Sequence, residues 1–440
     1  MNIFDKVAVY KPPKSVFDLS HKVVTSCNFG ELIPIFIEDC VPGDQFQISE
    51  EVICRLMPLA TPAFSQMDVY VHTWFVPFRL VWDDFEDWFS PDESEYDTPT
   101  ITFPSMLINT GISASSRGPG SLIDQMGIPM AENADATGFY VNPLPFRALS
   151  LTWNEWYRDQ DLQTKIAIDT TDGVDGQRSA NVSMKYRNLR RDYFTSARPT
   201  TQKGGDVELP ITGTASVDLV ANLSSEQQNI VDNNGAAVST QTPRAYNDSS
   251  DSFLAKAANS DKLFIDPNGT LEANLSSASS TTIEELRRAM VLQRWLERNM
   301  RGGTRYREAI LMHYGEDTQD SRLDRPEFIH GSRTPVSISE IQQSSQTDTT
   351  PQGTLAGKGI AYGSQGSSRY KVHEHGVIIS LLSVMPKPMY FEGVQKLYLK
   401  NDRFDFLVPL FARLGEQPVY TWELYNDCDE TNKTDVFGYQ

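Results

Sequence analysis

The sequence is poor in cysteine and in long apolar runs, and each shortage excludes a class of protein. Its 440 residues include four cysteines: Cys27, Cys40, Cys54 and Cys428. None belongs to a CxxC pair, which predicts free thiols rather than a disulfide framework, and folding in a reducing cytoplasm. The longest apolar run, Val377 to Met385, is far too short to span a bilayer, so we expect no membrane insertion. The first residues, 1–14, lack the apolar core of a signal peptide, so we expect no secretion.

Positive charge is also scarce. The chain has 39 basic and 58 acidic residues, a net charge of −19. Such an excess of acid argues against coating naked nucleic acid unaided, and it suits solubility or a basic partner. The acid is concentrated in Asp83 to Asp97, which has eight carboxylates and no base in fifteen residues. This run is typical of a solvated face, and a site for a basic partner is the alternative.

The hydrophobic pattern indicates a mainly β protein. The run Met67 to Phe78 is apolar on both faces of a strand, which predicts a strand covered on both sides. The strand-like segments lie far apart in the sequence and their connections are long. This spacing favours a β-sandwich or barrel with large insertions over a βαβ protein.

The connections have patterns of their own. Short helices are predicted in Val81 to Phe89 and Pro143 to Leu162. The polar segment Thr212 to Asp261 is predicted to be a surface insertion that adds little to the core. Lys262 to Leu275 reads as a hairpin around Asp-Pro-Asn-Gly, and Gly353 to Gly366 as a glycine-rich loop.

Positive charge gathers in one place, the run Arg287 to Glu308, which has seven arginines and two glutamates. Thr282 followed by Glu285 predicts a capping box at the start of a helix, and Gly302-Gly303 predicts its end. At 100° per residue, four arginines fall within about 60° of arc and apolar side chains cover most of the rest. These arginines are Arg287, Arg294, Arg298 and Arg301. The pattern predicts a largely buried helix with one arginine stripe, followed by a second short helix, Arg305 to Tyr314.

The candidate chemistry is sparse. His373-Glu374-His375 would place two histidines on one face of a strand, as in a metal-binding cupin. A third ligand is lacking nearby, since the next acid is Glu392, so ordinary strand histidines are the simpler interpretation. The sequence has no P-loop, no HExxH and no GxSxG. We therefore expect no catalytic residues, no metal and no cofactor.

Several runs together resemble the major capsid protein of microviruses, the small icosahedral single-stranded-DNA phages, and the gokushovirus branch above all. They occur in the family's order over nearly the whole chain. The runs are FDLSHKVVTSCNFGELIPI, VPGDQF, DVYVHTWFVPFRLVWDDFEDW, PLPFRALSLTWNEWYRDQDLQ, RRDYFTSARPTTQKG, TTIEELRRAMVLQRWLERNMRGGTRYREAILMHYG, DSRLDRPEFIHGS, EHGVIISLLSVMPKPMYFEG and DRFDFLVPLFARLGEQPVY.

The resemblance implies one domain over residues 1–440, a single eight-stranded antiparallel jelly-roll barrel made of two four-stranded sheets. It places a long loop and helical insertion at 79–200, a variable surface insertion at 212–261 and a helical insertion at 282–315. In the family a further segment normally follows the position of Gln440, so we expect this sequence to be truncated there.

The resemblance also implies a function. About sixty copies would form a T=1 shell around circular single-stranded DNA, since closed shells are built from repeated copies of one subunit. A small basic DNA-binding virion protein would lie inside. The variable insertion would form protrusions at the three-fold axes and contribute to host attachment, with a host surface receptor as partner. The protein would be assembled in the host bacterial cytoplasm and reside in the virion.

Three roles remain open for the arginine stripe. It can form salt bridges within the subunit, pair with acids of a neighbouring subunit, or contact packaged DNA phosphates, because guanidinium binds carboxylates and phosphates alike. Two other functions compete with the capsid subunit: an exported glycan-binding β-sandwich of the adhesin type, and a cupin-like metal enzyme. The first lacks an export signal and the second lacks ligands.

Overall fold

A computed structural model of the chain describes residues 14–60, 63–90, 100–128, 137–205, 207 and 282–440. Within the last range it leaves out 303–304, 318, 347, 350, 365, 410–415, 427–432 and 434. Between 208 and 281 it describes only the backbone of strands. The chain divides into two compact units, one formed by residues 1–201 and 299–440 and the other by residues 202–298.

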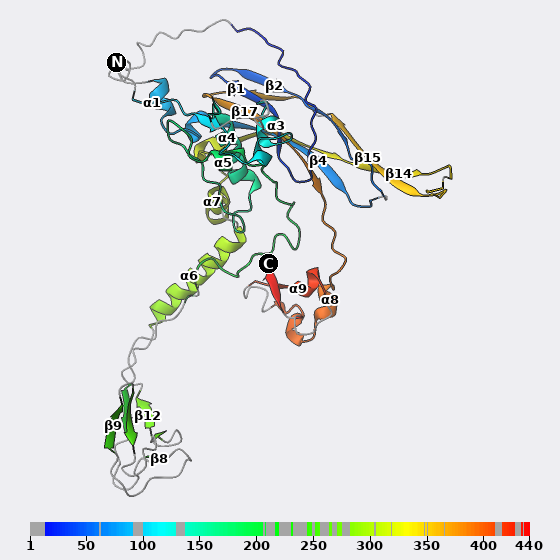
Figure 1. Cartoon of the computed structure of the whole chain (residues 1–440). Coiled ribbons are helices and arrows are strands. Elements are labelled where there is room, and N and C mark those ends of the chain that lie inside the picture. Colours follow the sequence, from blue (N-terminus) through cyan, green and yellow to red (C-terminus); the bar gives the residue numbers. More distant parts are fainter. Residues whose placement is uncertain are drawn as a thin grey trace. The chain divides into compact units, whose positions relative to one another are not determined.

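The first unit is organised by a four-stranded antiparallel sheet, the main sheet. Its strands, in spatial order, are β1 (Ile33–Cys40), β17 (Gly376–Pro386), β4 (Met67–Pro77) and β13 (Glu327–Pro335). Strands from the two ends of the chain therefore lie side by side, as the blue β1 and the orange β17 do in Figure 1. The long connections between them carry most of the rest of the molecule.

The two central strands are apolar on both faces because both faces are covered. On one face Trp74 and Ile379 pack with residues of the 78–186 region, and on the other Phe75 and Ile378 pack with a second layer of strands. The prediction that Met67 to Phe78 is a strand covered on both sides is confirmed.

The second layer consists of two small antiparallel sheets. The strands are β2 (Gln45–Ile48), β3 (Glu51–Arg55), β14 (Ser337–Gln342), β15 (Leu355–Ser364) and β16 (Ser368–Lys371). They pair in the orders β16-β2 and β14-β15-β3. Buried Ala361 packs with Val69 and Val384 of the main sheet, and Phe46 and Tyr370 pack with Phe75.

Strand β15 corrects the expected glycine-rich loop at Gly353 to Gly366. Its glycines lie where a side chain would collide: a Cβ on Gly359 would come within 2.4 Å of the Leu56 side chain, and one on Gly363 would meet Thr334. Glycine is therefore used here for close packing of a strand, although its low strand propensity predicts a loop.

The other face of the main sheet is covered by the connection between β4 and residue 186. Its elements are α1 (Phe85–Phe89), β5 (Met106–Ile108), α3 (Leu122–Gln125), β6 (Phe139–Val141), α4 (Leu144–Thr152), a π-helical turn η4 (Trp153–Tyr157) and α5 (Arg178–Val182). Helix α4 lies against the sheet and buries Leu144, Phe146 and Leu149 in the largest core cluster. The two helices predicted in this region are confirmed.

The second unit contains three strand pairs among its described residues. They are β7 (Ser216–Leu219) with β12 (Leu271–Asn274), β8 (Ile230–Val231) with β11 (Phe264–Ile265), and β9 (Arg244–Asp248) with β10 (Asp251–Ala255). The predicted hairpin at Lys262 to Leu275 is wrong, because its two strands pair with β8 and β7 instead of with each other. Most of the segment Thr212 to Asp261 lies outside the described residues.

The remaining elements follow these strand pairs along the chain, and the first of them, α6, begins within the second unit, which ends at Arg298. They are α6 (Ile283–Gly302), α7 (Tyr306–Tyr314), α8 (Lys396–Leu399), β18 (Pro418–Tyr420), α9 (Thr421–Leu424) and β19 (Val436–Tyr439). The fold class is mainly β with antiparallel sheets and short helices. Among the described helices, none has the length and apolar character needed to cross a membrane. Cys27, Cys40 and Cys54 are free thiols, and Cys428 lies outside the described residues.

Candidate assembly surfaces

Helix α6 begins and ends as its sequence predicts. The backbone N–H of Thr282 donates to Glu285 Oε2 (2.8 Å), and the N–H of Glu285 donates to Thr282 Oγ1 (3.2 Å). This reciprocal pair is a capping box, which satisfies two N–H groups that a helix start leaves without partners. The helix ends at Gly302, while Gly303 lies outside the described residues.

The predicted burial of α6 within the chain is wrong. All four arginines of the stripe are exposed, and Met300 alone among the helix's described residues is buried. The helix also exposes large apolar side chains on both flanks of the stripe: Ile283, Leu286, Met290, Val291, Leu292 and Trp295. The mistake arose because an apolar arc shows that a helix needs covering, but not whether its own chain covers it.

The four arginines of the stripe do not share one environment. Arg301, at the C-terminal end of α6, forms an ion pair with Glu416, with Nε and Oε1 2.6 Å apart. The Glu416 side chain is 7% exposed, whereas that of Arg301 is 59% exposed. Arg301 is thus paired with a carboxylate of the first unit. Arg287, Arg294 and Arg298 lie nearer the N-terminal end of the helix.

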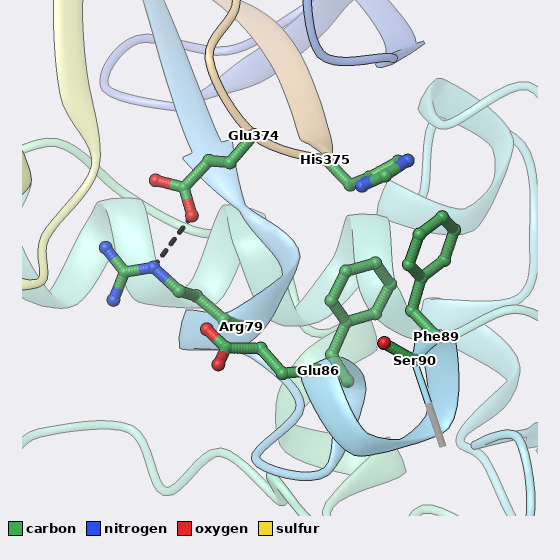
Figure 2. A pocket seen from close by; sticks show the side chains of 7 residues that line it. Arg79, Glu86, Phe89, Ser90, Glu374 and His375 are labelled. Carbon is green, nitrogen blue, oxygen red and sulfur yellow. Dashed lines mark hydrogen bonds and ion pairs between the residues drawn. The ribbon is translucent and has the colours of Figure 1, made fainter. Parts of the chain in front are cut away.

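The tripeptide His373-Glu374-His375 is not on a strand, as predicted, but in the turn between β16 and β17. Figure 2 shows that the side chains of Glu374 and His375 have different neighbours. Glu374 Oε2 accepts from Arg79 Nε (2.7 Å), and the His375 ring lies 4.4 Å from the Phe89 ring between centroids. A turn here separates the two histidines, which a strand would have aligned. Among the described residues, no three potential ligands are grouped in a way that could hold a metal ion.

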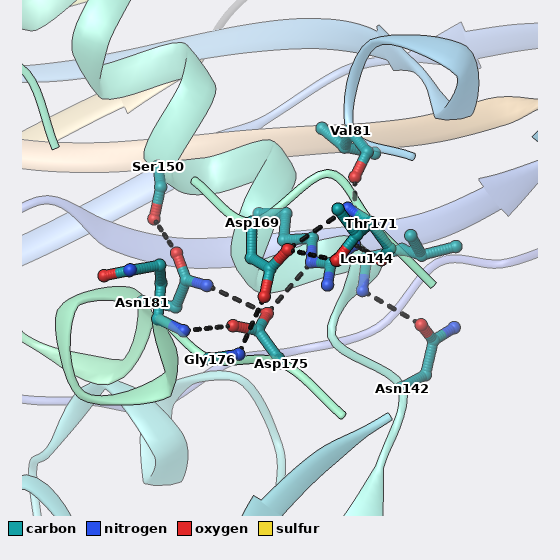
Figure 3. Close-up of polar contacts among 11 residues, drawn as sticks. Val81, Asn142, Leu144, Ser150, Asp169, Thr171, Asp175, Gly176 and Asn181 are labelled. Carbon is teal, nitrogen blue, oxygen red and sulfur yellow. Dashed lines mark hydrogen bonds and ion pairs between the residues drawn. The ribbon is translucent and has the colours of Figure 1, made fainter. Parts of the chain in front are cut away.

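Among the charged residues that the structure describes, Arg147 of α4 is the most deeply buried, and Figure 3 labels its partners Val81, Thr171 and Asp175. Its Nε donates to Asp175 Oδ2 (2.9 Å), and both side chains are fully buried. Arg147 Nη1 also donates to the carbonyls of Val81 and Thr171, at 3.2 Å each. Asp175 Oδ2 accepts from Asn181 Nδ2 (3.1 Å). The guanidinium therefore connects α4 to the turn that follows β4 and to the loop before α5.

A second buried polar group lies on β4. Trp74 Nε1 donates to Tyr157 Oη (3.1 Å), and the same oxygen lies 2.9 Å from His72 Nδ1. Because the indole supplies the proton on one side, the tyrosine hydroxyl can donate to His72 only while that nitrogen is unprotonated. Burial, helped by the charge of Arg187, lowers the pKa of His72 to about 4.

Comparison with known proteins decides the family. Residues 6–440 match the family described as capsid protein (F protein). The chain belongs to this capsid protein family. It is 33% identical over 448 residues to the capsid protein VP1 of Bdellovibrio phage phiMH2K, covering 99% of this chain and 81% of the relative.

Two further relatives agree. The capsid protein VP1 of Chlamydia phage 1 is 30% identical over 100% of this chain and 83% of its own length. That of Spiroplasma virus 4 is 31% identical over 97% of this chain and 79% of its own length. The resemblance to microvirus major capsid proteins is thereby confirmed. The role of a capsid protein is structural and not enzymatic, and it implies assembly of many copies in a virion.

For a capsid protein the exposed side of α6 has a suitable composition. Interfaces between proteins are enriched in aromatic residues, methionine and arginine. Trp295, Met290 and the stripe supply all three on one helix. The spacing of the arginines in the sequence indicated a candidate contact surface on this helix. The sequence did not show that the apolar side chains beside the arginines are exposed.

Proposed function

We propose that the protein is the major subunit of a small T=1 shell, built from about sixty copies, that encloses a circular single-stranded DNA genome. The family match over residues 6–440 carries the proposal. The exposed Trp295, Met290 and Val291 of α6 support it, because several large apolar side chains exposed on one helix are typical of a protein contact.

We further infer a single jelly-roll barrel as the common scaffold of the subunit. Such a barrel is expected to have strands that are distant in sequence as neighbours, as in the order β1-β17-β4-β13 of the main sheet. The second layer covers one face of this main sheet. The regions 79–200, 212–261 and 282–315 are then insertions between barrel strands in one domain.

The partners follow from the charge. A subunit of net charge −19 repels DNA on average, so a small basic virion protein inside the shell would neutralise part of the genome. The polar insertion 212–261 is proposed to contribute to host attachment through a surface receptor. Assembly would take place in the host bacterial cytoplasm.

The arginine stripe is proposed to pair with carboxylates of a neighbouring subunit. Arg301 already shows this chemistry inside the chain, with Glu416 as its partner. Arg287, Arg294 and Arg298 sit among exposed apolar side chains, where a neighbour would remove water and strengthen charged hydrogen bonds. The acidic run Asp83 to Asp97 is one source of partners, and its residues 91–97 lie outside the described residues.

Negative-stain microscopy of the expressed protein tests the proposal. We expect uniform round particles of a single small diameter. Concentrated, folded protein that stays monomeric under every assembly condition, and instead binds immobilised glycans, would favour the adhesin-type alternative.

A further inference from the structure

The outward face of the second layer can be read from its strand register. In β15 the residues with odd numbers face the main sheet, since Ala361 is in the core and a Cβ on Gly363 would meet Thr334 of β13. The even-numbered Lys358, Ile360 and Tyr362 therefore face outward. Directly paired residues share a face.

Register then places partners from other strands beside them. On β3, Arg55 lies opposite Ile360, and Ile53 lies opposite Tyr362. On β16, Tyr370 packs inward, so Arg369 and Lys371 point outward, opposite Gln47 and Gln45 of β2. We call this surface the basic face, defined by Arg55, Lys358, Arg369 and Lys371 together with Ile53, Ile360 and Tyr362.

The charge of the basic face is opposite to that of the whole chain. All four cations of the five strands point outward, and they meet one outward carboxylate, Glu51, which lies opposite Ser364. The other acid of these strands, Glu340, pairs with Gly357 and so lies on the opposite side of the sheet from the cations, where its side chain is exposed. A chain of net charge −19 thus presents four cations and one carboxylate on the outward side of the two small sheets of the second layer.

These cations also differ from the other basic side chains nearby. Arg79 is paired with Glu374 and Asp324, and Arg333 with Asp68. By contrast, none of the four cations of the basic face forms an ion pair with any residue that the structure describes. Within the described part of the chain their positive charge is therefore not neutralised by an ion pair, and it suits an anionic partner.

An exposed aromatic ring lies among these charges. Tyr362 is 65% exposed and Ile53, directly opposite, is 76% exposed. Strands that present an aromatic ring and cations on the same outward side suit single-stranded nucleic acid. The bases stack on the ring and the phosphates lie on the cations.

We propose that the basic face binds single-stranded DNA and lines the inside of the shell. Lys358, Arg55, Arg369 and Lys371 contact phosphates without regard to sequence, and Tyr362 stacks against a base. This inference rests on the proposed function, since it names the surface that the enclosed genome would touch. It also assigns DNA to the basic face rather than to the arginines of α6.

A second copy of the chain is the rival occupant, because an acidic subunit would also be attracted. The composition favours DNA, since the four cations are spread over three strands, while the exposed apolar side chains are Ile53, Ile360 and Tyr362 on β3 and β15 and Ile341 on β14. Interfaces between subunits are instead poor in lysine at their core, whereas two of the four cations here are lysines.

The experiment compares two matched double variants with the wild type. Lys358→Gln with Lys371→Gln changes the basic face, and Arg287→Gln with Arg294→Gln removes the same charge from α6. The nucleic-acid content of purified particles is measured by the ratio of absorbance at 260 and 280 nm. Binding of dissociated subunits to a labelled oligothymidylate is measured by anisotropy over a range of salt.

We expect the basic-face variant to form particles in normal yield with less nucleic acid. Its slope of log affinity against log salt should fall by about 1.4, because each phosphate contact on a single strand contributes about 0.7. The α6 variant should keep the wild-type slope. Tyr362→Ala should weaken binding several-fold, and Tyr362→Phe should restore it, since the ring and not the hydroxyl stacks.

Two results would overturn the inference. Unchanged nucleic-acid content and an unchanged slope in the basic-face variant would exclude DNA from this face. Folded subunits of that variant that no longer form particles would assign the face to a neighbouring copy. If the wild type itself forms no particles, the proposed function fails, while the anisotropy measurement still decides whether the basic face binds DNA.

Discussion

Arg147 and the arginines of α6 have the same side chain, but Arg147 is buried and the others are exposed. Arg147 is fully buried, with Asp175 and two carbonyls as partners within the subunit. Arg287 and Arg294 are exposed on a helix whose apolar side chains are exposed as well. The difference separates two tasks: a buried guanidinium holds one chain in its fold, whereas an exposed arginine beside apolar surface is suited to a contact between chains.

The largest effect on subunit stability is expected from Arg147→Met. The change leaves Asp175 buried without its cation, which costs about 3–5 kcal/mol of the free energy of unfolding. Denaturant unfolding of the dissociated subunit measures it. Arg147→Met combined with Asp175→Leu should recover part of the loss, because no unpaired charge then remains. A single variant within about 1 kcal/mol of the wild type would refute the assigned role.

The next largest effect is expected from low pH, which should lower the stability of the subunit through the buried His72. The pKa of His72 is lowered from 6.5 to about 4 by burial. Between these values the unfolded chain binds a proton that the folded chain does not, so stability falls as the pH drops from 6.5 to 4. The loss is complete below pH 4 and reaches up to about 3 kcal/mol, at 1.36 kcal/mol per pKa unit.

The measurement is the free energy of unfolding as a function of pH for the wild type and His72→Gln. The variant should lack the decline that this histidine causes between pH 6.5 and 4. His373→Gln, at an exposed position, is the control and should keep that decline. Identical pH profiles for the wild type and His72→Gln would show that another group controls acid stability.

Substitutions on α6 are expected to affect assembly more than the stability of the subunit. Arg294→Ala with Arg298→Ala should change subunit stability by less than about 1 kcal/mol, since exposed substitutions usually have small effects. Assembly should be impaired, and we expect a lower particle yield by sedimentation. Normal assembly with poor genome packaging would instead assign these arginines to DNA and contradict their proposed place in an interface.

The smallest effect on stability is expected from shortening the insertion 212–261. Closure entropy changes by only about 0.6 kcal/mol for each doubling or halving of loop length. A shortened protein should unfold at nearly the wild-type temperature and form particles that attach poorly to host cells. Insoluble protein after a conservative shortening would show that the segment supports the fold.

Features set by neighbouring residues were predictable. The capping box of Thr282 and Glu285, the end of α6 at Gly302 and the doubly apolar strand β4 all follow from short-range patterns. Those patterns act within a few residues, so a single stretch of sequence contains them. Two of the failures were the glycine-rich strand β15 and the hairpin expected at Lys262 to Leu275, where pairing with distant strands overrides local preference.

The sequence by itself determined that the chain is mainly β, acidic and without a recognisable catalytic motif, and the resemblance of its runs to the microvirus family indicated a capsid protein. Only the tertiary structure decided which charges act together. Arg55, Lys358, Arg369 and Lys371 lie up to 316 positions apart in the sequence, and strand pairing together with packing on the main sheet turns all four to the outward side of the second layer. The physical reason is that a strand's side chains alternate between faces, so a residue's surroundings depend on which distant strand pairs with it and in what register.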